Sequence, residues 1–425
     1  MSAIQSTFLA ENRYWLSNSP KQNFYLYLEL QGSEAPASAD RVPLNLSLVI
    51  DRSGSMAGDK IAYAKKAAQF IVDNLSPEDR VSIVQYDDIV EVLSPSAPVL
   101  NKQELRQRIA LMEARNMTNL SGGMLAGYEQ VERTKQARFV NRVLLLSDGL
   151  ANHGITDPTV LQQMVQEKFR NAGIAVSTFG VGADFNELLM TSLSEYGGAN
   201  YYFIESPDKI PGIFAEELRG LLAVVAQGVK MEIQLPSSDF RCEKVYGFPA
   251  EITKDKVVIN FNDLFSLEKK AVLLKMTSLR PIEHNFAFGL QLKYDNALGN
   301  YAQIEENQEL EVLVTSDPEL VQANTQNIVL EQTTFFVANE LYEEVIRLAE
   351  VGNREGAKRL IQQIKDFMEQ HFQILPPTEE LKKQYEEILR YEQQMKNFDE
   401  MSHYDVAMAM KAGRSQSYNM RHKKR

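Results

Sequence analysis

Three short segments of the sequence carry Asp, Ser and Thr side chains at positions suited to hold a cation. In the first, SLVIDRSGSMAGDK, an apolar run ends on Asp51, and Ser53 and Ser55 follow at alternate positions. A single Ser, Thr or Asp is enough to cap a helix after a strand, so two serines exceed that need. The segment RNMTNLSGG adds Thr118, and RVLLLSDGLANHG adds Asp148. If these segments meet above one edge of a sheet, their side chains form an oxygen-only metal site.

A site of this composition suits Mg²⁺, which favours six oxygen ligands in an octahedron and keeps part of its water. We expect the hydroxyls of Ser53, Ser55 and Thr118 to bind the ion directly. Asp51 and Asp148 then act through ordered water and orient the serines. One coordination position stays open, so the chemistry predicted is recognition of a carboxylate supplied by another molecule.

The elements that must position these residues belong to an α/β unit. From Leu44 to about Leu221, short β-branched apolar runs alternate with amphipathic stretches, which is typical of a parallel sheet flanked by helices. The runs are LNLSLVI, RVSIVQY, RVLLLSD, IAVSTFGVG and NYYFIE, and the first four end near Asp, Gly or Ser. Open α/β sheets place ligands at this carboxyl edge. We therefore expect a doubly wound, mostly parallel, Rossmann-like sheet within residues 42–226.

Outside this unit, apolar residues alternate with polar ones, which predicts half-buried strands. The segment NFYLYLELQG precedes the unit, and VKMEIQLP and several similar runs follow it up to about Val314. A lone N-terminal strand is unstable, so we expect residues 1–41 to pair with the strands of residues 227–316. The sequence thus predicts an α/β unit inserted into an all-β, sandwich-like domain.

The remaining residues show helical periodicity followed by a basic end. Apolar stripes, with Gly352 and the Pro376-Pro377 pair as breaks, predict a helical region over residues 317–413. Residues 414–425 are polar and basic, and we expect them to form a disordered tail.

The D-R-S-G-S sequence, taken with Thr118 and Asp148, resembles the metal-ion-dependent adhesion site of the von Willebrand factor A (VWA) domain family. The likeness covers about Val42 to Leu221, and the wider layout resembles intracellular bacterial members with an added β domain. The resemblance implies a site that binds Mg²⁺ or Mn²⁺ and recognises an acidic residue of a protein partner.

The resemblance also assigns the ligands to three loops. The first loop supplies Asp51, Ser53 and Ser55, the second supplies Thr118, and the third supplies Asp148. Asn116 and Met117 stand where relatives commonly have glycines, which implies a different shape around the partner's carboxylate.

Composition excludes several classes of partner. The formal net charge of −12 argues against nucleic acid and anionic lipid, because both carry phosphate charge. Cys242 is the only cysteine, so no intrachain disulfide or CxxC metal site is possible and nothing indicates an oxidising compartment. The segment MSAIQSTFLAENRYWLSNSP lacks the features of a secretory signal, and no run approaches the roughly twenty apolar residues of a membrane span. We expect a cytoplasmic protein.

Two other interpretations of the same residues stay open. Mg²⁺-dependent phosphoryl-transfer hydrolases also place an Asp at the end of a parallel strand, but those of the haloacid dehalogenase type need a second acid two residues later. This chain has Ser53 there, and it contains no GxxxxGK[ST] phosphate loop. The other possibility is a structural protein whose site is empty or filled by its own chain. We expect a scaffold or adaptor that is not an enzyme and that binds an Asp or Glu of a protein partner.

Overall fold

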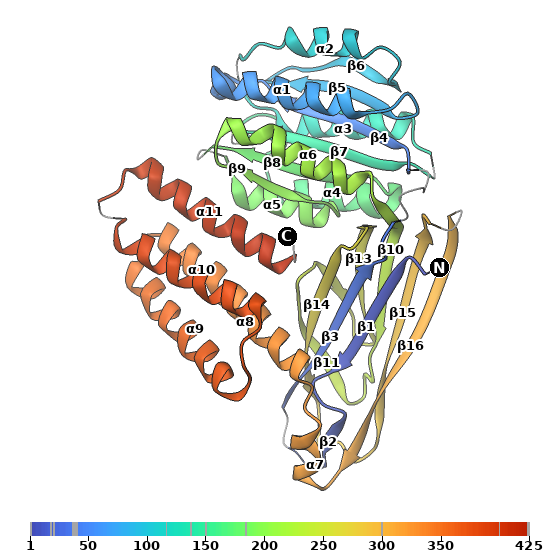
Figure 1. Ribbon diagram of the computed structural model, residues 1–425, viewed down its shortest axis with the longest axis vertical. Coiled ribbons are helices and arrows are strands. Elements are labelled where there is room, and N and C mark those ends of the chain that lie inside the picture. The colour runs from blue at the N-terminus through green and yellow to red at the C-terminus, as the bar shows by residue number, and fades with distance from the viewer. Residues whose placement is uncertain are drawn as a thin grey trace.

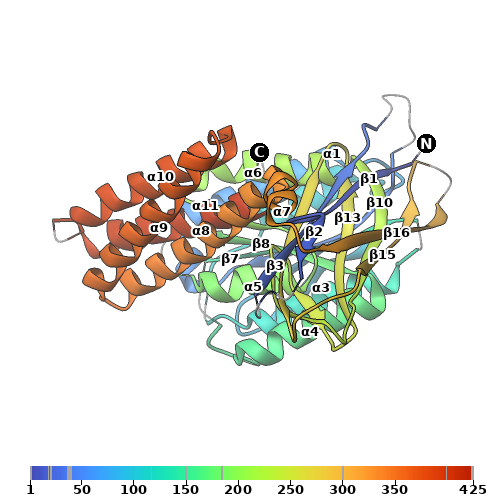
Figure 2. The same ribbon diagram turned by 90° about the horizontal axis from the view of Figure 1, so that it is seen from below.

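The chain folds into three parts of different architecture (Figure 1). An α/β unit lies at the top of this view, two packed and mainly antiparallel sheets lie at lower right, and a group of helices lies at lower left. Figure 2 shows that the helices project to one side of the other two parts. The computed structural model describes residues 2–17, 19, 22–35, 41–115, 117–136, 138–148, 151–182, 185–298, 301–398 and 400–422.

The α/β unit contains a six-stranded sheet in the order β6-β5-β4-β7-β8-β9. Its neighbouring strands are parallel, except that β5 and β6 are antiparallel. The strands are β4 (Leu44–Asp51), β5 (Arg80–Tyr86), β6 (Val90–Pro98), β7 (Val140–Ser147), β8 (Ala175–Val181) and β9 (Tyr201–Ile204). β4 and β7 are buried along their whole length, because central strands of a parallel sheet are covered on both faces.

Helices cover both faces of this sheet. Apolar residues of α1, α2 and α6 form the core on one face, and those of α3, α4 and α5 form the core on the other. The helical bounds are η1 (Gly54–Met56), α1 (Asp59–Asn74), α2 (Lys102–Ala110), α3 (Leu120–Arg133), α4 (Pro158–Ala172), α5 (Glu187–Tyr196), η2 (Pro207–Lys209) and α6 (Ile210–Leu221). The expected doubly wound, mostly parallel sheet is confirmed.

Two further sheets pack face to face around a separate apolar core. The four-stranded sheet has the order β1-β3-β14-β11, and the six-stranded sheet has the order β12-β13-β10-β15-β16-β2. Their strands are β1 (Ile4–Ala10), β2 (Tyr14–Leu16), β3 (Asn23–Gly32), β10 (Val224–Gln234), β11 (Phe240–Tyr246), β12 (Ala250–Ile252), β13 (Lys256–Phe265), β14 (Lys269–Ser278), β15 (Phe286–Asn296) and β16 (Ala302–Thr315). Alternating apolar residues form this core, since successive side chains of a strand point to opposite faces.

The α/β unit is inserted into this sandwich. β3 precedes the unit in sequence, yet it pairs antiparallel with β14, in a register that runs from Asn23 opposite Thr277 to Gln31 opposite Lys269. β10 follows the last helix of the unit and enters the other sheet, where it pairs with β13 and β15. The expected insertion into a sandwich-like domain is therefore confirmed.

The helical part follows the sandwich. Its helices are α7 (Pro318–Ala323), α8 (Asn327–Glu350), α9 (Arg354–Ile374), α10 (Glu379–Lys396) and α11 (His403–Arg421). No helix in the described part of the chain is both long and apolar enough to cross a membrane.

The expectation of a disordered tail from residue 414 is wrong, because residues 414–421 belong to α11. The small Gly413 lets this helix approach the ring of Tyr391 and the hydroxyl of Tyr342, since a Cβ at Gly413 would lie 3.1–3.2 Å from these atoms. The hydroxyl of Tyr418 accepts a hydrogen bond from the backbone N–H of Tyr201 in β9, at 3.0 Å. Tertiary contacts thus order a segment whose polar composition alone favours disorder. Residues 423–425 lie outside the described residues.

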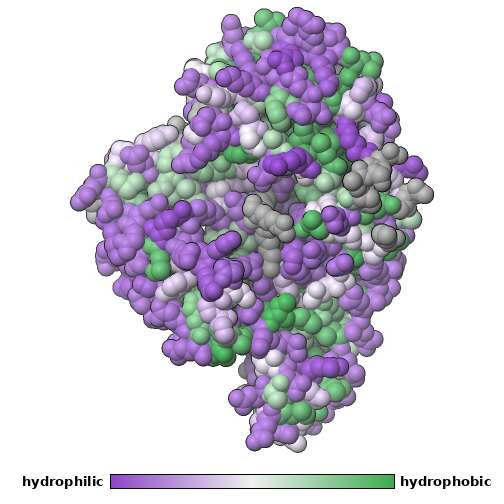
Figure 3. All heavy atoms as spheres, in the orientation of Figure 1, coloured by the Kyte–Doolittle hydropathy of each residue, from purple (hydrophilic) through white to green (hydrophobic). Residues whose placement is uncertain are grey.

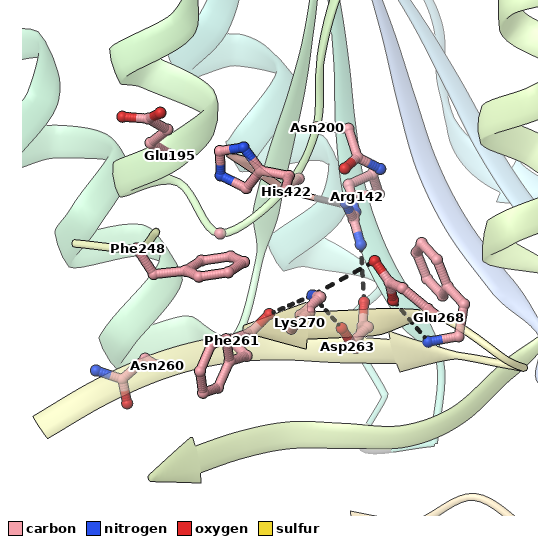
Figure 4. Close-up of a pocket in the computed structure, with 13 residues that line it drawn as sticks. Arg142, Glu195, Asn200, Phe248, Asn260, Phe261, Asp263, Glu268, Lys270 and His422 are labelled. Carbon is pink, nitrogen blue, oxygen red and sulfur yellow. Dashed lines mark hydrogen bonds and ion pairs between the residues drawn. The ribbon is translucent and has the colours of Figure 1, made fainter. Parts of the chain in front are cut away.

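A buried ion pair connects the α/β unit to the sandwich. The Arg142 guanidinium of β7 donates to the carboxylate of Asp263 in β13 at 2.8 Å, and it lies 3.7 Å from the carboxylate of Glu217 in α6. Figure 4 shows Arg142 and Asp263 pointing toward each other. All three side chains are buried, so the two parts share a desolvated polar contact rather than an apolar surface alone.

Candidate metal centre

The first predicted loop begins where β4 ends. Asp51 is the last residue of this strand and is fully buried. Its Oδ1 accepts the backbone N–H of Ser53 at 2.8 Å, and its Oδ2 accepts the hydroxyl of Ser147 from β7 at 2.7 Å. These bonds fix the carboxylate between the ends of two adjacent strands. Asp51 therefore orients the loop that carries the two serines.

The two serines and Asp148 form one chain of hydrogen-bonded oxygens. The Ser53 and Ser55 hydroxyls are 3.1 Å apart, and the Ser55 hydroxyl donates to Oδ1 of Asp148 at 2.9 Å. Ser53 and Asp148 are buried, whereas Ser55 is exposed. Four of the five predicted residues therefore meet at the carboxyl edge of the sheet, as the positions of β4 and β7 require.

The backbone of Thr118 is hydrogen-bonded to the segment that follows Asp148. Its N–H donates to the side-chain oxygen of Asn152 at 2.9 Å, and its carbonyl accepts the N–H groups of Asn152 and His153, each at 3.2 Å. The second loop is thereby fastened to the segment that follows β7. Within the described residues, no hydrogen bond joins the Thr118 hydroxyl to the other four side chains. Asn116, which the sequence also singles out, lies outside the described residues.

A second polar cluster holds the loops in place. Asp87 is buried and forms ion pairs with Arg52 at 3.0 Å and Arg115 at 2.7 Å. Burial favours the neutral carboxyl of Asp87, but the hydrogen bond from Arg115 and the nearby cations lower its pKa below the usual value. The backbone N–H of Arg115 donates to the carbonyl of Arg52 at 2.7 Å. Arg52, from the same D-R-S-G-S motif, therefore ties the first loop to the second.

The family of the α/β unit follows from comparison with known proteins. The model of the von Willebrand factor type A domain matches residues 45–216. These residues form a VWA domain. Their boundaries enclose all five predicted site residues, from the end of β4 to the end of β7.

Known proteins are similar to this chain in sequence and in structure. The uncharacterized protein YfbK of Escherichia coli is 31% identical over 231 residues, which are 52% of this chain and 39% of YfbK. This chain thus spans less than half of that relative. A solved von Willebrand factor type A structure from Catenulispora acidiphila has a TM-score of 0.69, 15% identity and 86% coverage of both chains. The ArnB paralog VWA2 of Sulfolobus acidocaldarius has a TM-score of 0.63 and 17% identity, with 97% of this chain and 98% of that chain covered. At these identities the two structures show a shared fold.

Lys60 contacts one of the five predicted site residues, although the sequence motifs did not point to it. It lies in the first turn of α1, and its ammonium forms an ion pair with Oδ2 of the buried Asp148. A Cβ at Gly182 would lie 3.6 Å from the Lys60 Nζ, so the side chain also reaches the end of β8. The sequence feature that could have identified Lys60 is its position, because it is a lysine in the first turn of the helix after the motif loop, five residues beyond Ser55.

The charge state of Asp51 reflects its surroundings. Burial raises the pKa of Asp51 to about 6, although hydrogen bonds from Ser147 and Ser53 favour the carboxylate. The negative charge of Asp148 adds to the increase. A carboxylate at the end of a buried strand therefore needs nearby positive charge in order to stay ionised.

The donor set of the VWA site fits a hard divalent cation. It offers hydroxyl and carboxylate oxygens, which Mg²⁺ and Mn²⁺ prefer, and no sulfur or imidazole ligand is among the five residues. Among the described residues, no group of three or more His, Cys, Asp or Glu side chains is placed to hold a metal. The hydroxyl-rich arrangement is thus the candidate site in the described part of the chain.

Proposed function

We propose that this protein is a Mg²⁺-dependent protein-interaction module, acting as a scaffold or adaptor. Its VWA domain binds an Asp or Glu side chain of a partner protein through Asp51, Ser53, Ser55, Thr118 and Asp148. VWA domains are generally protein-interaction modules with such a site, which supports the assignment. The proposal includes Mn²⁺ as an alternative ion and a cytoplasmic location, which is consistent with a single, buried, free cysteine.

One observation carries the proposal: the Ser55 hydroxyl contacts both the Ser53 hydroxyl and the Asp148 carboxylate. Ser53 and Ser55 thus present neutral oxygens on one side, while Asp51 and Asp148 supply buried negative charge behind them. When bound, Mg²⁺ supplies a Lewis-acidic centre that accepts one further oxygen ligand. Ser55 is exposed, so an external carboxylate has access to this side of the site.

Titration calorimetry tests metal binding. Wild-type protein should bind one Mg²⁺ or Mn²⁺, and the Ser53→Ala plus Ser55→Ala variant should lose this binding because two direct ligands are removed. The matched control is Ser237→Ala plus Ser238→Ala, a serine pair that follows β10 in the sandwich. Circular dichroism establishes that each variant is folded. Unchanged Mg²⁺ affinity in the first variant contradicts the assignment, and absence of binding in wild type favours a structural role.

Partner recognition is tested by recovery of binding proteins in excess Mg²⁺ and in EDTA. Chelation should release the partner more effectively than moderate salt, because the protein's charge of −12 repels acidic partners at long range and only short-range contact attracts them. Thr118→Ala should weaken the complex, whereas His153→Ala, which alters an exposed side chain, should matter less. Replacing single Asp and Glu residues of the partner must identify one that is essential.

We also propose that the site does not catalyse hydrolysis. A phosphoryl-transfer enzyme of the haloacid dehalogenase type needs an acid two residues after Asp51, and Ser53 occupies that position. The backbone N–H of Ser53 donates to Asp51, which leaves this carboxylate in an orienting role. Hydrolysis of a phosphate ester that requires both Mg²⁺ and Asp51 would show the opposite.

A further inference from the structure

Three exposed apolar side chains stand on the loops that build the metal site. They are Ile89 in the turn between β5 and β6, Met117 directly before Thr118, and Ile155 after β7; their exposed fractions are 51%, 51% and 39%. Single exposed apolar residues are common on protein surfaces, and Figure 3 shows apolar residues scattered over the face it presents. The three residues differ from such scatter because hydrogen bonds connect their loops to one another.

These hydrogen bonds place the apolar side chains on loops around Thr118. The N–H of Asn119 donates to the carbonyl of Asp87 at 2.7 Å, which fastens the Met117 segment to the turn carrying Ile89. The N–H of Ile155 donates to the hydroxyl of Ser121 at 2.9 Å, which fastens the third loop to the first turn of α3. We call Ile89, Met117 and Ile155 the apolar rim.

The charges beside the rim favour an anionic occupant. Lys60 and Arg115 are ion-paired with Asp148 and Asp87, and in each pair the carboxylate is fully buried while the cation is partly exposed, by 25% and 44%. Glu91 lies 3.8 Å from Arg115, and the negative charges of Glu91 and Asp88 offset part of the Arg115 charge. The exposed ends of both ion pairs are therefore cationic, although the whole chain carries a charge of −12.

We propose that this face docks an extended protein segment in which an Asp or Glu is flanked on both sides by large apolar side chains. The inference rests on the proposed function and adds the apolar rim as the feature that selects the partner. The acidic side chain approaches Ser53, Ser55 and Thr118, and its neighbours cover the rim. Covering exposed apolar surface is favourable, so sequence around the acid contributes to affinity.

Fluorescence anisotropy with four labelled nine-residue peptides tests this proposal on the full-length protein. The peptides carry a central Glu or a central Gln, each flanked either by Leu and Ile or by Ser and Gly. In Mg²⁺, the apolar-flanked Glu peptide should bind about tenfold more tightly than the polar-flanked Glu peptide, which corresponds to burial of about one apolar side chain. The Gln peptides detect adhesion that does not depend on the carboxylate.

The rim is tested by Met117→Ser plus Ile155→Ser. This variant should lose the preference for apolar flanks and keep the wild-type Mg²⁺ affinity. The control is Leu100→Ser, since Leu100 is 79% exposed but follows the end of β6, at the amino edge of the sheet. Equal affinity for both Glu peptides, or a preference that survives in the rim variant, overturns the rim proposal alone. If neither Glu peptide binds in a Mg²⁺-dependent manner, the proposed function fails as well.

Discussion

The ammonium of Lys60 forms an ion pair with Oδ2 of Asp148, while Oδ1 of the same carboxylate accepts the Ser55 hydroxyl. Both oxygens of a buried carboxylate at the proposed metal site are therefore engaged by the chain itself. A cation fixed beside a divalent ion repels it, and the same cation draws an anionic partner. If the site binds metal as proposed, Lys60 should weaken that binding and favour the binding of a partner's carboxylate.

The first prediction follows from this ion pair. Lys60→Met should raise Mg²⁺ affinity by about tenfold, because a positive charge is removed from a partly buried site. Without Mg²⁺ the variant should unfold at a lower temperature than wild type, since Asp148 loses its partner, and Mg²⁺ should restore more stability than it does in wild type. Lys60→Arg is the charge-conserving control. Calorimetric affinity equal to wild type in Lys60→Met would contradict the prediction.

The second prediction concerns Glu187 in α5. This buried carboxyl accepts the hydroxyl of Tyr201 at 2.9 Å and lies 4.0 Å from Arg414. Burial raises the pKa of Glu187 to about 7 from an ordinary value of 4.5, despite the nearby Lys411 and Arg414 charges. Between these pH values the folded protein binds more protons than the unfolded chain does, so stability falls as pH rises, and the loss is complete above pH 7.

Glu187→Gln should remove this dependence. Urea unfolding at pH 5 and pH 8 should show that the variant loses less stability than wild type over this interval, by about 3 kcal/mol at most. Glu205→Gln replaces an exposed carboxylate and serves as the control. Identical pH slopes for wild type and Glu187→Gln would show that Glu187 titrates in the same way in both states.

The third prediction concerns the connection between the VWA domain and the sandwich. Arg142→Met should destabilise the protein by about 3–5 kcal/mol, because it leaves Asp263 buried without its partner. The double variant Arg142→Met plus Asp263→Asn should lose less free energy of unfolding than the two single variants lose in sum. Arg170→Met removes an exposed ion pair to Glu251 between α4 and β12, and it should cost less than about 1 kcal/mol. Equal losses in urea unfolding for Arg142→Met and Arg170→Met would contradict this account.

The fourth prediction compares two glycines in helices. A Cβ at Gly127 in α3 would lie 2.4 Å from Cγ2 of Val49 in β4, so Gly127→Ala should cost about 1–3 kcal/mol through overpacking. Gly212 in α6 has no atom within 4 Å of such a Cβ, so Gly212→Ala should be neutral or stabilise by up to about 1 kcal/mol. Thermal unfolding of both variants checks the contrast, and a reversed order would show that α3 can move away from the sheet at little cost.

The fold and part of the candidate site could be predicted from the sequence, because hydrophobic periodicity and the residues at strand ends carry that information. The alternation around Leu26 and Leu28 revealed a strand without a neighbour, and the inserted fold follows from its need for one. Asp51 ends β4 and Asp148 directly follows β7, its parallel neighbour in the same sheet, so their approach was predictable from topology.

The sequence was insufficient where a partner lies far along the chain. Arg142 interrupts an apolar strand, and its role depends on Asp263, 121 residues away in another sheet. The contact of Lys60 with Asp148 could not be predicted from the sequence, because it depends on the direction in which α1 runs relative to the end of β7. The order of α11 depends on packing of Gly413 and Tyr418 against distant elements, which outweighs the polar composition of that segment.

The pairing of β3 with β14 also has a consequence for synthesis. Translation proceeds at about 5–20 residues per second, so the roughly 240 residues between these strands take on the order of tens of seconds to emerge. During that interval β1 and β3 can form a hairpin, and the VWA domain can fold on the nascent chain. The backbone edge of β3 that pairs with β14 stays open until β14 leaves the ribosome, and the apolar face with Phe24, Leu26 and Leu28 stays uncovered until β10, β13 and β15 of the opposite sheet have emerged. Slowing or interrupting translation before residue 269 therefore exposes the chain to aggregation at this strand.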